Sequence, residues 1–306
     1  MGFYELTVDD EYQFERVDKY ISDVLADFSR SYIQKLITDE NVLVNGKKIK
    51  QSYKVNEGDK VTVTTVENII PDIIPENIPL HILYEDDYVL VVDKPKDMVV
   101  HPAPGHYEHT LVNAIMYHCK DNLSGINGVL RPGIVHRIDK DTTGSLIICK
   151  CNEAHEKIAE QLKNHSLNRE YLAVVEGNIE EENGRIVKNI GRSLNDRKKM
   201  AVNVANGKSA ITNYEVIERF KGYTLVKCKL ETGRTHQIRV HMASIGHPVV
   251  GDEVYNTKKA PVKTYGQALH AYILGFEHPT TSEYIETKAP IPEYFEKLLS
   301  YLRNMK

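Results

Sequence analysis

One stretch of the chain interrupts an apolar run with a dense set of polar residues. Residues 133–146 read Gly-Ile-Val-His-Arg-Ile-Asp-Lys-Asp-Thr-Thr-Gly-Ser-Leu, so a His-Arg-x-Asp-Lys-Asp cluster lies between two apolar segments. A surface loop joining two strands is the simple alternative, but the size and mixed charge of the cluster disfavour it. Carboxylates such as Asp139 act as nucleophiles or bases when neighbouring charges control their ionisation. The cluster is therefore the first candidate for a reactive site.

A second polar stretch follows a segment that alternates apolar and polar residues. Residues 231–241, Glu-Thr-Gly-Arg-Thr-His-Gln-Ile-Arg-Val-His, open a predicted helix that ends near Gly246. Its apolar stripe consists of Ile238, Met242 and Ile245. Gln237 and His241 share a different face, because residues four apart are neighbours on a helix. Arg234 precedes the helix and is free to point toward an anion near its N-terminus.

Basic residues gather in two regions of a chain whose formal charge is −4. The first region holds Arg30, Lys35, Lys47, Lys48, Lys50 and Lys54. The second holds Arg185, Lys188, Arg192, Arg197, Lys198, Lys199 and Lys208. One such loop alone is more simply a solvated surface. Two local basic regions on an acidic chain instead predict that a polyanion binds at chosen places.

The elements that position these clusters begin with a small α/β domain at residues 1–66. Its predicted elements are a helix with Val17, Ile21, Val24 and Leu25 on the buried face, a second with Ile33, Leu36 and Ile37, and strands at 42–44 and 61–63. Ser29 is expected to cap the second helix, and Asn45-Gly46 to form a tight turn. Prolines at 71, 75 and 79 mark residues 67–79 as a stiff connector.

Residues 80–306 are predicted to form one larger α+β domain, in which helices and loops flank a central mixed or antiparallel β-sheet. Strands outnumber helices and do not alternate with them, which disfavours a doubly wound parallel sheet. The predicted strands are 88–92, 134–138, 145–149, 171–175, 214–217 and 225–230, the last two as a hairpin. Helices are expected after a cap at Thr110, at 152–162, and from Gln237 onward.

Composition excludes several classes of protein. The 306 residues, 41% hydrophobic and 27% charged, can build a packed core without disulfides or a metal. Four cysteines are too few for a secreted disulfide scaffold. The N-terminus lacks the features of a signal peptide, and the apolar run at 88–92 is too short to cross a bilayer. A cytoplasmic monomer without membrane contact is expected.

Motifs follow one another in order along the second domain. They are Asp93-Lys94-Pro95 with Val100-His101-Pro102, residues 136–144, 169–174 and 207–214, and residues 233–239 with Gly251-Asp252. This ordered set resembles the RluA/RluD family of pseudouridine synthases, which act on ribosomal RNA. Residues 16–21, Ser29-Arg30 and Asn45-Gly46 also resemble the alpha-L RNA-binding domain shared with a small-subunit ribosomal protein.

The resemblance implies that uridine is isomerised, with its base cut from ribose at N1 and rejoined through C5. Asp139 matches the family's catalytic aspartate, and Tyr171 matches its active-site tyrosine. Arg234 is expected to pair with Asp139 and keep the carboxylate ionised. A uracil flipped out of RNA needs an aromatic face, which Tyr171 supplies. The reaction involves no redox step, so no cofactor and no metal are expected. Attack on the sugar, attack on the base and removal of a ribose proton all remain open for Asp139.

A further set of residues is expected to contact ribosomal large-subunit RNA, the partner that the resemblance implies. Arg137 points to the same side of an extended segment as Asp139, where it could reach a phosphate or fill the gap left by the base. A lone histidine such as His136 is more often a structural residue than an acid–base catalyst. The expected RNA contacts are Arg137, His136, Arg30, Lys35, Lys47, Lys48, Arg197, Lys198, Lys199, Gln237 and Arg239.

Other functions fit the same residues less well. Asp139 and Asp141 could be the paired carboxylates of a glycosidase. However, the chain has no Trp to form a platform for a sugar, and its two basic regions would have no function in a glycosidase. Residues 149–151, with His155 or His118-Cys119, lack the usual zinc spacing and are better explained as buried thiols.

Two alternatives concern RNA itself. A non-catalytic RNA-binding module would fit residues 1–66 alone, but an aspartate set beside Arg137 and Lys140 favours a catalyst. Transfer RNA, or both kinds of RNA, could also be the substrate of a synthase.

Overall fold

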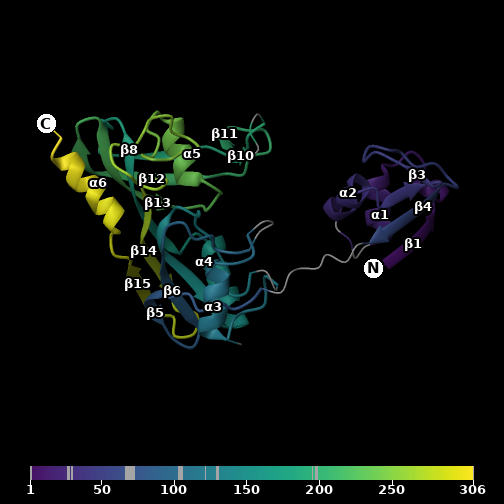
Figure 1. The fold of residues 1–306 in the computed structure, drawn as a ribbon, viewed down its shortest axis with the longest axis horizontal. Helices are drawn as coiled ribbons and strands as arrows, with labels where there is room; N and C mark the ends of the chain where they lie inside the picture. Colours follow the sequence, from purple (N-terminus) through teal and green to yellow (C-terminus); the bar gives the residue numbers. More distant parts are fainter. Residues whose placement is uncertain are drawn as a thin grey trace. The chain divides into compact units, whose positions relative to one another are not determined.

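The computed structural model describes residues 2–25, 28, 30–65, 73–102, 106–120, 122–128, 131–194, 196 and 199–305. Packing divides the chain into two compact units, residues 1–70 and 71–306 (Figure 1). The sequence predicted domains at residues 1–66 and 80–306, joined by a connector at 67–79. The observed division after residue 70 falls within this predicted connector. The predicted N-cap Ser29 and the predicted RNA contacts Arg197 and Lys198 lie outside the described residues.

The first unit packs two helices against one antiparallel sheet. Its elements are β1 (Gly2–Thr7), a short 3₁₀ turn (Asp10–Tyr12), α1 (Val17–Val24), α2 (Arg30–Thr38), β2 (Val42–Val44), β3 (Lys47–Lys48) and β4 (Lys60–Thr65). The strand order is β1-β4-β2-β3. Asn45 and Gly46 have φ values of 51° and 72°, and two positive values in a row are what the tightest hairpin turns require. The predicted helices and turn are therefore confirmed, but Val24, predicted on the buried face of the first helix, is exposed, and β1 was not predicted.

A buried carboxylate ties the two helices of the first unit together. Asp18 on α1 accepts hydrogen bonds from Arg16, Arg30 and Gln34. Burial by itself would raise the pKa of Asp18, but these hydrogen bonds bring it well below its usual value. The guanidinium of Arg30, predicted to contact RNA, is thus paired with Asp18, although the Arg30 side chain keeps 46% of its surface exposed. Of the other predicted RNA contacts in this unit, Lys48 pairs with Glu40, and two lysines are exposed on the surface, Lys35 and Lys47.

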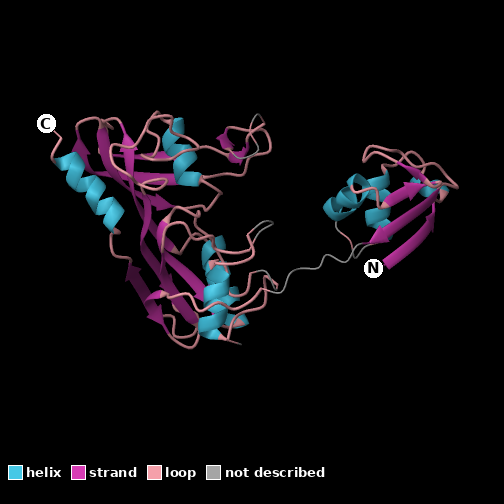
Figure 2. Cartoon of the chain, in the orientation of Figure 1, coloured by secondary structure: helices cyan, strands magenta, loops and turns pink. Residues whose placement is uncertain are grey.

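The second unit is dominated by strands. Its elements are β5 (His81–Glu85), β6 (Val89–Lys94), α3 (Leu111–Cys119), β7 (Thr143–Cys149), α4 (Asn152–Lys163), β8 (Asn168–Glu176), β9 (Asn183–Val187), β10 (Ile190–Arg192), β11 (Met200–Val202), β12 (Ile211–Phe220), β13 (Tyr223–Leu230), α5 (Gln237–Ser244), β14 (Leu269–Glu277), β15 (Tyr284–Lys288) and α6 (Glu293–Arg303). Figure 2 shows helices at the borders of a long twisted sheet. The predicted α+β class is confirmed.

The large sheet joins segments that are far apart in the sequence. Its order in the described residues is β5-β6-β7-β14-β8-β13-β12-β9, with β15 also paired to β14. Only β7 and β14 run parallel, and every other pair is antiparallel. The sheet is therefore mixed, as predicted. The predicted hairpin is the β12–β13 pair, with the turn at residues 221–222.

Both faces of the sheet are covered where β6 and β7 lie. Leu90 and Val92 of β6 pack into a core that contains the apolar side of α3, whereas Val89 and Val91 pack with residues of α4. Alternate residues of a strand point to opposite faces, which explains why this segment is apolar throughout. Thr110 caps α3, as predicted, through a capping box with Asn113. None of the helices that the structure describes has the length and apolar character needed to cross a membrane.

Candidate active site

Asp139 lies in a loop that leads into β7. Ile134 forms one isolated bridge with Ile148, and the chain then runs without strand pairing until β7 begins at Thr143. The prediction of a strand over 134–138 is therefore wrong beyond that bridge. The reason is visible in the cleft beside it, which is lined by every residue from Val135 to Asp139.

A buried ammonium group holds this loop from the interior. Lys94 is fully buried, and its Nζ donates hydrogen bonds to the carbonyl oxygens of Pro95, Met98 and Lys140 at 2.7–2.9 Å. Burial lowers the pKa of Lys94 to about 7, against the opposing effect of the Asp141 and Asp139 charges. Because Lys140 follows Asp139 directly, Lys94 positions the backbone next to the Asp139 carboxylate.

The partner of Asp139 is Arg239, from the first turn of α5. Nη1 of Arg239 donates to Oδ2 of Asp139 at 2.9 Å, while its Nε and Nη2 bind both oxygens of Asp252 at 2.6 and 2.8 Å. The Arg239 side chain is 6% exposed and that of Asp252 fully buried, whereas that of Asp139 keeps 25% of its surface exposed. Burial alone would lower the pKa of Arg239, but the two carboxylates raise it above its usual value.

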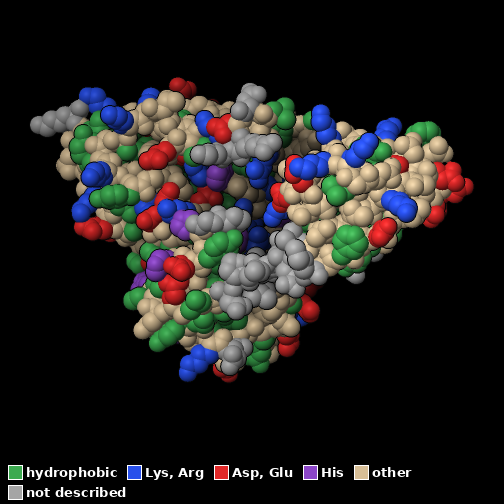
Figure 3. Space-filling model, turned by 45° about the vertical axis from the view of Figure 1, so that its right-hand side comes forward, with side chains coloured by type: hydrophobic (Ala, Val, Ile, Leu, Met, Phe, Trp, Pro, Cys, Tyr) green, Lys and Arg blue, Asp and Glu red, His purple; other side chains and the backbone are tan. Residues whose placement is uncertain are grey.

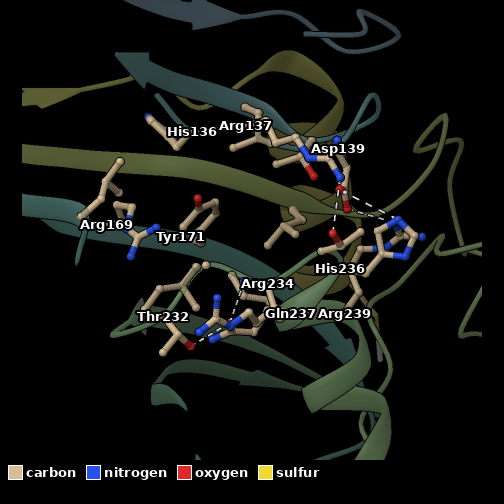
Figure 4. A pocket seen from close by; sticks show the side chains of 18 of the residues that line it. His136, Arg137, Asp139, Arg169, Tyr171, Thr232, Arg234, His236, Gln237 and Arg239 are labelled. Atoms are coloured by element: carbon tan, nitrogen blue, oxygen red, sulfur yellow. Dashed lines mark hydrogen bonds and ion pairs between the residues drawn. The ribbon is translucent and has the colours of Figure 1, made fainter. Parts of the chain in front are cut away.

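The prediction that Arg234 pairs with Asp139 is corrected by this geometry. Nε of Arg234 donates to the carbonyl oxygen of Ser209 at 3.0 Å, and its backbone N–H donates to the side chain of Gln237. Arg234 precedes α5, whereas Arg239 lies within the helix on the side that meets Asp139 and Asp252. Both arginines line the cleft, but only Arg239 reaches the carboxylate (Figure 4).

His236 completes the surroundings of Asp139 and was not predicted. Its Nε2 lies 3.9 Å from Oδ1 of Asp139, and its Nδ1 is 2.9 Å from the hydroxyl of Tyr255. Burial lowers the pKa of His236, although the Asp139 charge opposes this effect. The residue lies in the quoted 233–239 motif, so the sequence marked its position without indicating a role.

Tyr171 and Arg169 reach the cleft from the same strand, β8. They are two residues apart, so both side chains point to one face, and they are 7% and 6% exposed. Burial raises the pKa of Tyr171, an effect that the Arg169 charge opposes. Figure 4 shows the Tyr171 ring between Arg169 and the Asp139 end of the cleft. Tyr171 thus lines the same cleft as Asp139.

The two residues that precede Asp139 differ in character. Arg137 is exposed at the cleft, and its Nη2 donates to the hydroxyl of Thr235 at 3.3 Å. His136 accepts a hydrogen bond from the backbone N–H of Ile147 through Nε2 at 3.3 Å. Burial, reinforced by the nearby Arg169 charge, lowers the pKa of His136 to about 3. His136 is therefore a neutral residue that joins the loop to β7, which agrees with a structural role.

Gln237, assigned to RNA from the sequence, uses its side chain inside the protein. Its Oε1 accepts from the Thr232 hydroxyl and from the backbone N–H of Arg234. Its Nε2 donates to the carbonyl oxygen of Ile211 and contacts the Thr212 hydroxyl. Gln237 is 3% exposed, so it joins the start of α5 to β12. Both polar atoms of the Gln237 amide are therefore occupied by hydrogen bonds within the protein, which leaves neither to bind RNA.

These side chains surround one cleft of about 550 Å³. Its described lining includes the cationic groups of Arg137, Lys163, Arg169, Arg234 and Arg239, with Asp139 as the carboxylate. On the face seen in Figure 3, Lys, Arg and His side chains gather around a hollow of the larger unit. The volume is that of a typical small-molecule site, and the charges suit an anionic substrate.

The rival functions gain no support from the geometry. Asp141 does not line the cleft with Asp139, so the paired carboxylates of a glycosidase are absent from it. Glu85, His118 and Cys119 approach one another closely enough for a metal ion. However, Glu85 already pairs with Lys150, and burial raises the pKa of the Cys119 thiol to about 11. These residues form an ion-pair cluster beside a buried thiol.

Comparison with known proteins agrees with the motifs. Residues 88–244 match the RNA pseudouridylate synthase family, and residues 15–61 match the S4 domain. The chain is 51% identical over 303 residues to an RNA pseudouridine synthase of Bacillus subtilis, covering 99% of each chain. It is 42% identical to the ribosomal large subunit pseudouridine synthase D of Zymomonas mobilis, covering 97% of each chain.

A solved structure shares the fold. Human RNA pseudouridylate synthase domain containing 1 is 25% identical, with a TM-score of 0.56 over 75% of this chain and 97% of that chain. The resemblance inferred from the ordered motifs is thereby confirmed. On its sequence matches and its fold together, the chain belongs to the RNA pseudouridylate synthase family.

Proposed function

We propose that the protein converts specific uridines of ribosomal large-subunit RNA to pseudouridine, with Asp139 as the catalytic carboxylate. The observation that carries this proposal is the pairing of a partly exposed Asp139 with a buried Arg239 in a cleft lined by several cationic side chains. Relatives named ribosomal large subunit pseudouridine synthase D, at 41–42% identity, support ribosomal RNA as the substrate.

The chemistry asks for one reactive carboxylate whose charge and orientation are controlled. The N1–C1′ bond of uridine breaks, a C5–C1′ bond forms, C5 loses a proton and N1 gains one. Oδ2 of Asp139 is held by Arg239, and Oδ1 lies 3.9 Å from Nε2 of His236. Arg239 thereby fixes the orientation of the carboxylate that this role needs. Attack on the sugar, attack on the base and proton removal from ribose are all compatible with this placement.

The uridine would have to leave its stack to reach Asp139. Tyr171 offers a buried aromatic ring beside the carboxylate, which replaces the stacking that a flipped base loses. Arg137 lies at the exposed edge of the cleft, where it could fill the gap in the RNA or bind a phosphate. Base flipping by these two residues is therefore part of the proposal.

The first unit would add affinity for RNA. Residues 15–61 match the S4 domain, and the exposed Lys35 and Lys47 supply phosphate contacts that carry no sequence information. We assign residues 1–66 to RNA binding and residues 80–306 to catalysis, joined by the connector at 67–79. A monomer acting in the cytoplasm remains a prediction from the sequence.

Tritium release from ribosomal RNA labelled at C5 of uracil tests this function directly, because C5 loses its hydrogen only when the base is reattached there. Wild-type protein should release tritium, and Asp139→Asn should release none while still binding the RNA. Release from transfer RNA alone would reassign the substrate. Absence of release from either RNA, with RNA binding intact, would leave a non-catalytic RNA-binding protein and refute the proposal.

A further inference from the structure

Arg169 is a buried cation that the proposed chemistry does not use. It is 6% exposed, and its Nε has no hydrogen-bond partner among the described residues. The described part of the chain also provides no carboxylate that pairs with its guanidinium. Arginine stays charged in proteins, so deprotonation cannot remove the cost of burying this charge without a partner. A buried unpaired charge destabilises a fold, which points to a partner that arrives from outside.

The position of the guanidinium directs it into the substrate cleft. Arg169 lines the cleft together with Tyr171, and Figure 4 shows its guanidinium beside the tyrosine ring. A Cβ atom at Gly233 would lie 2.7 Å from Nη1 of Arg169. The absence of a side chain at Gly233 therefore leaves the room that the guanidinium occupies, next to the loop that carries Arg234.

Two further basic residues, outside β8, also line the cleft. Lys163 ends α4, His165 lies in the following turn, and both are exposed lining residues of the cleft. Asp139 and Arg239 lie toward the opposite end from Arg169, with Tyr171 between them (Figure 4). Arg169 and Tyr171 are about 6.6 Å apart along the strand, a separation that a single nucleotide can bridge.

Phosphate is the group of RNA that best matches this arrangement. The planar guanidinium binds phosphate oxygens in a bidentate manner and is more weakly hydrated than an ammonium group. A uracil stacked on Tyr171 directs its reacting bonds toward Asp139. The group of the RNA that is left to meet Arg169 is therefore the sugar–phosphate backbone. The carbonyl oxygens of uracil are neutral acceptors and would leave the charge of Arg169 uncompensated.

We propose that Arg169 binds a backbone phosphate of the RNA strand next to the uridine to be modified. The inference rests on the proposed function, because it takes RNA as the occupant of the cleft. In this role Arg169 sets the position of the strand relative to Asp139. The phosphate in turn supplies the counter-charge that the free protein lacks.

The first test compares Arg169→Met, Arg169→Lys and the wild-type protein in binding a large-subunit ribosomal RNA transcript at several salt concentrations. Arg169→Met should bind about tenfold more weakly at low salt. Its log–log salt slope should be shallower by about 0.7–0.9, the amount expected for one phosphate contact. Arg169→Lys should keep most of the slope. The matched control, Arg303→Met, removes an exposed cation that pairs with Glu218 on another part of the unit, and should leave the slope unchanged.

A second measurement separates this role from a structural one. Arg169→Met should have a urea midpoint equal to or above that of the wild type without RNA, because it removes an unpaired buried charge. An unchanged salt slope would overturn the proposal. So would a clearly lower urea midpoint, or a slower single-turnover rate without any change in salt slope, which would indicate contact with the base. Tritium release by the wild-type protein is scored separately, so a failure of the proposed function is distinguishable from a failure of this inference.

Discussion

Arg239 donates a hydrogen bond to Asp139 at 2.9 Å, although one hundred residues separate them in the chain. The other two nitrogens of the same guanidinium, Nε and Nη2, donate hydrogen bonds to the two carboxylate oxygens of Asp252. Asp252 in turn accepts hydrogen bonds from the backbone N–H groups of Val254 and Tyr255. The Asp139 carboxylate is therefore held by a cation whose own orientation is fixed by a second, buried carboxylate, which is the preorganisation that the proposed catalytic role requires.

Arg239→Gln should abolish isomerisation and destabilise the protein. The substitution leaves Asp252 buried without its cation, and breaking a buried pair in this way costs about 3–5 kcal/mol. Urea unfolding measures the loss of free energy. Adding Asp252→Asn to this variant should restore part of the stability but no activity. If Arg239→Gln alone had the same unfolding free energy as the wild type, the prediction that the buried Arg239–Asp252 pair stabilises the fold would be wrong.

Arg234→Gln should be milder, since Arg234 contacts a backbone carbonyl and no carboxylate. We expect its free energy of unfolding to stay within about 1 kcal/mol of the wild type and tritium release to persist at a reduced rate. Single-turnover rates compared at equal RNA saturation give the effect. If Arg234→Gln were as inactive as Asp139→Asn, Arg234 and not Arg239 would be the essential partner.

Gln237→Leu should lower stability without changing how RNA binding depends on salt. The variant keeps the side-chain size but leaves buried partners, including the Thr232 hydroxyl and the Ile211 carbonyl, without hydrogen bonds. Unsatisfied buried groups of this kind cost about 1–3 kcal/mol each. Chemical denaturation and the salt slope are measured on the same preparation. Weaker RNA binding at full stability would return Gln237 to the RNA contacts, because the loss of a neutral amide contact lowers affinity without changing the salt slope.

His270 should make the protein less stable in mild acid. It is fully buried between β7 and α6, contacts the Thr143 hydroxyl, and burial lowers its pKa to about 4, against a backbone hydrogen bond to Ala289. The unfolded state binds a proton below about pH 6.5, whereas the folded state does so only near pH 4. Stability is therefore lost as the pH falls through that window, by up to about 1.4 kcal/mol per unit.

His270→Gln removes this titration and provides the comparison. The difference in unfolding free energy between wild type and variant should shrink steadily from pH 6.5 to pH 4 and stay constant above pH 7. Urea titrations at half-unit intervals measure it. A difference independent of pH would mean that the pKa of His270 is the same in the folded and unfolded states, so that its burial has no effect on its protonation.

Local patterns in the sequence determined much of this protein by themselves. The alternation of Val226, Cys228 and Leu230 with lysines marks β13, and Asn45-Gly46 marks a hairpin turn. These features depend on residues a few positions apart, whose backbone preferences act locally. The ordered motifs likewise identified the family, with Asp139 and Tyr171 among its expected site residues.

Tertiary structure decided which groups meet. The sequence offered Arg234 and Arg239 within one motif, and only the docking of α5 beside the β7 loop places Arg239 on Asp139. The same docking buries the amide of Gln237. The strand expected at 134–138 becomes a wall of the cleft, because strand pairing there is limited to the single Ile134–Ile148 bridge. Contacts between distant segments depend on sheet register and helix placement, which no local pattern specifies.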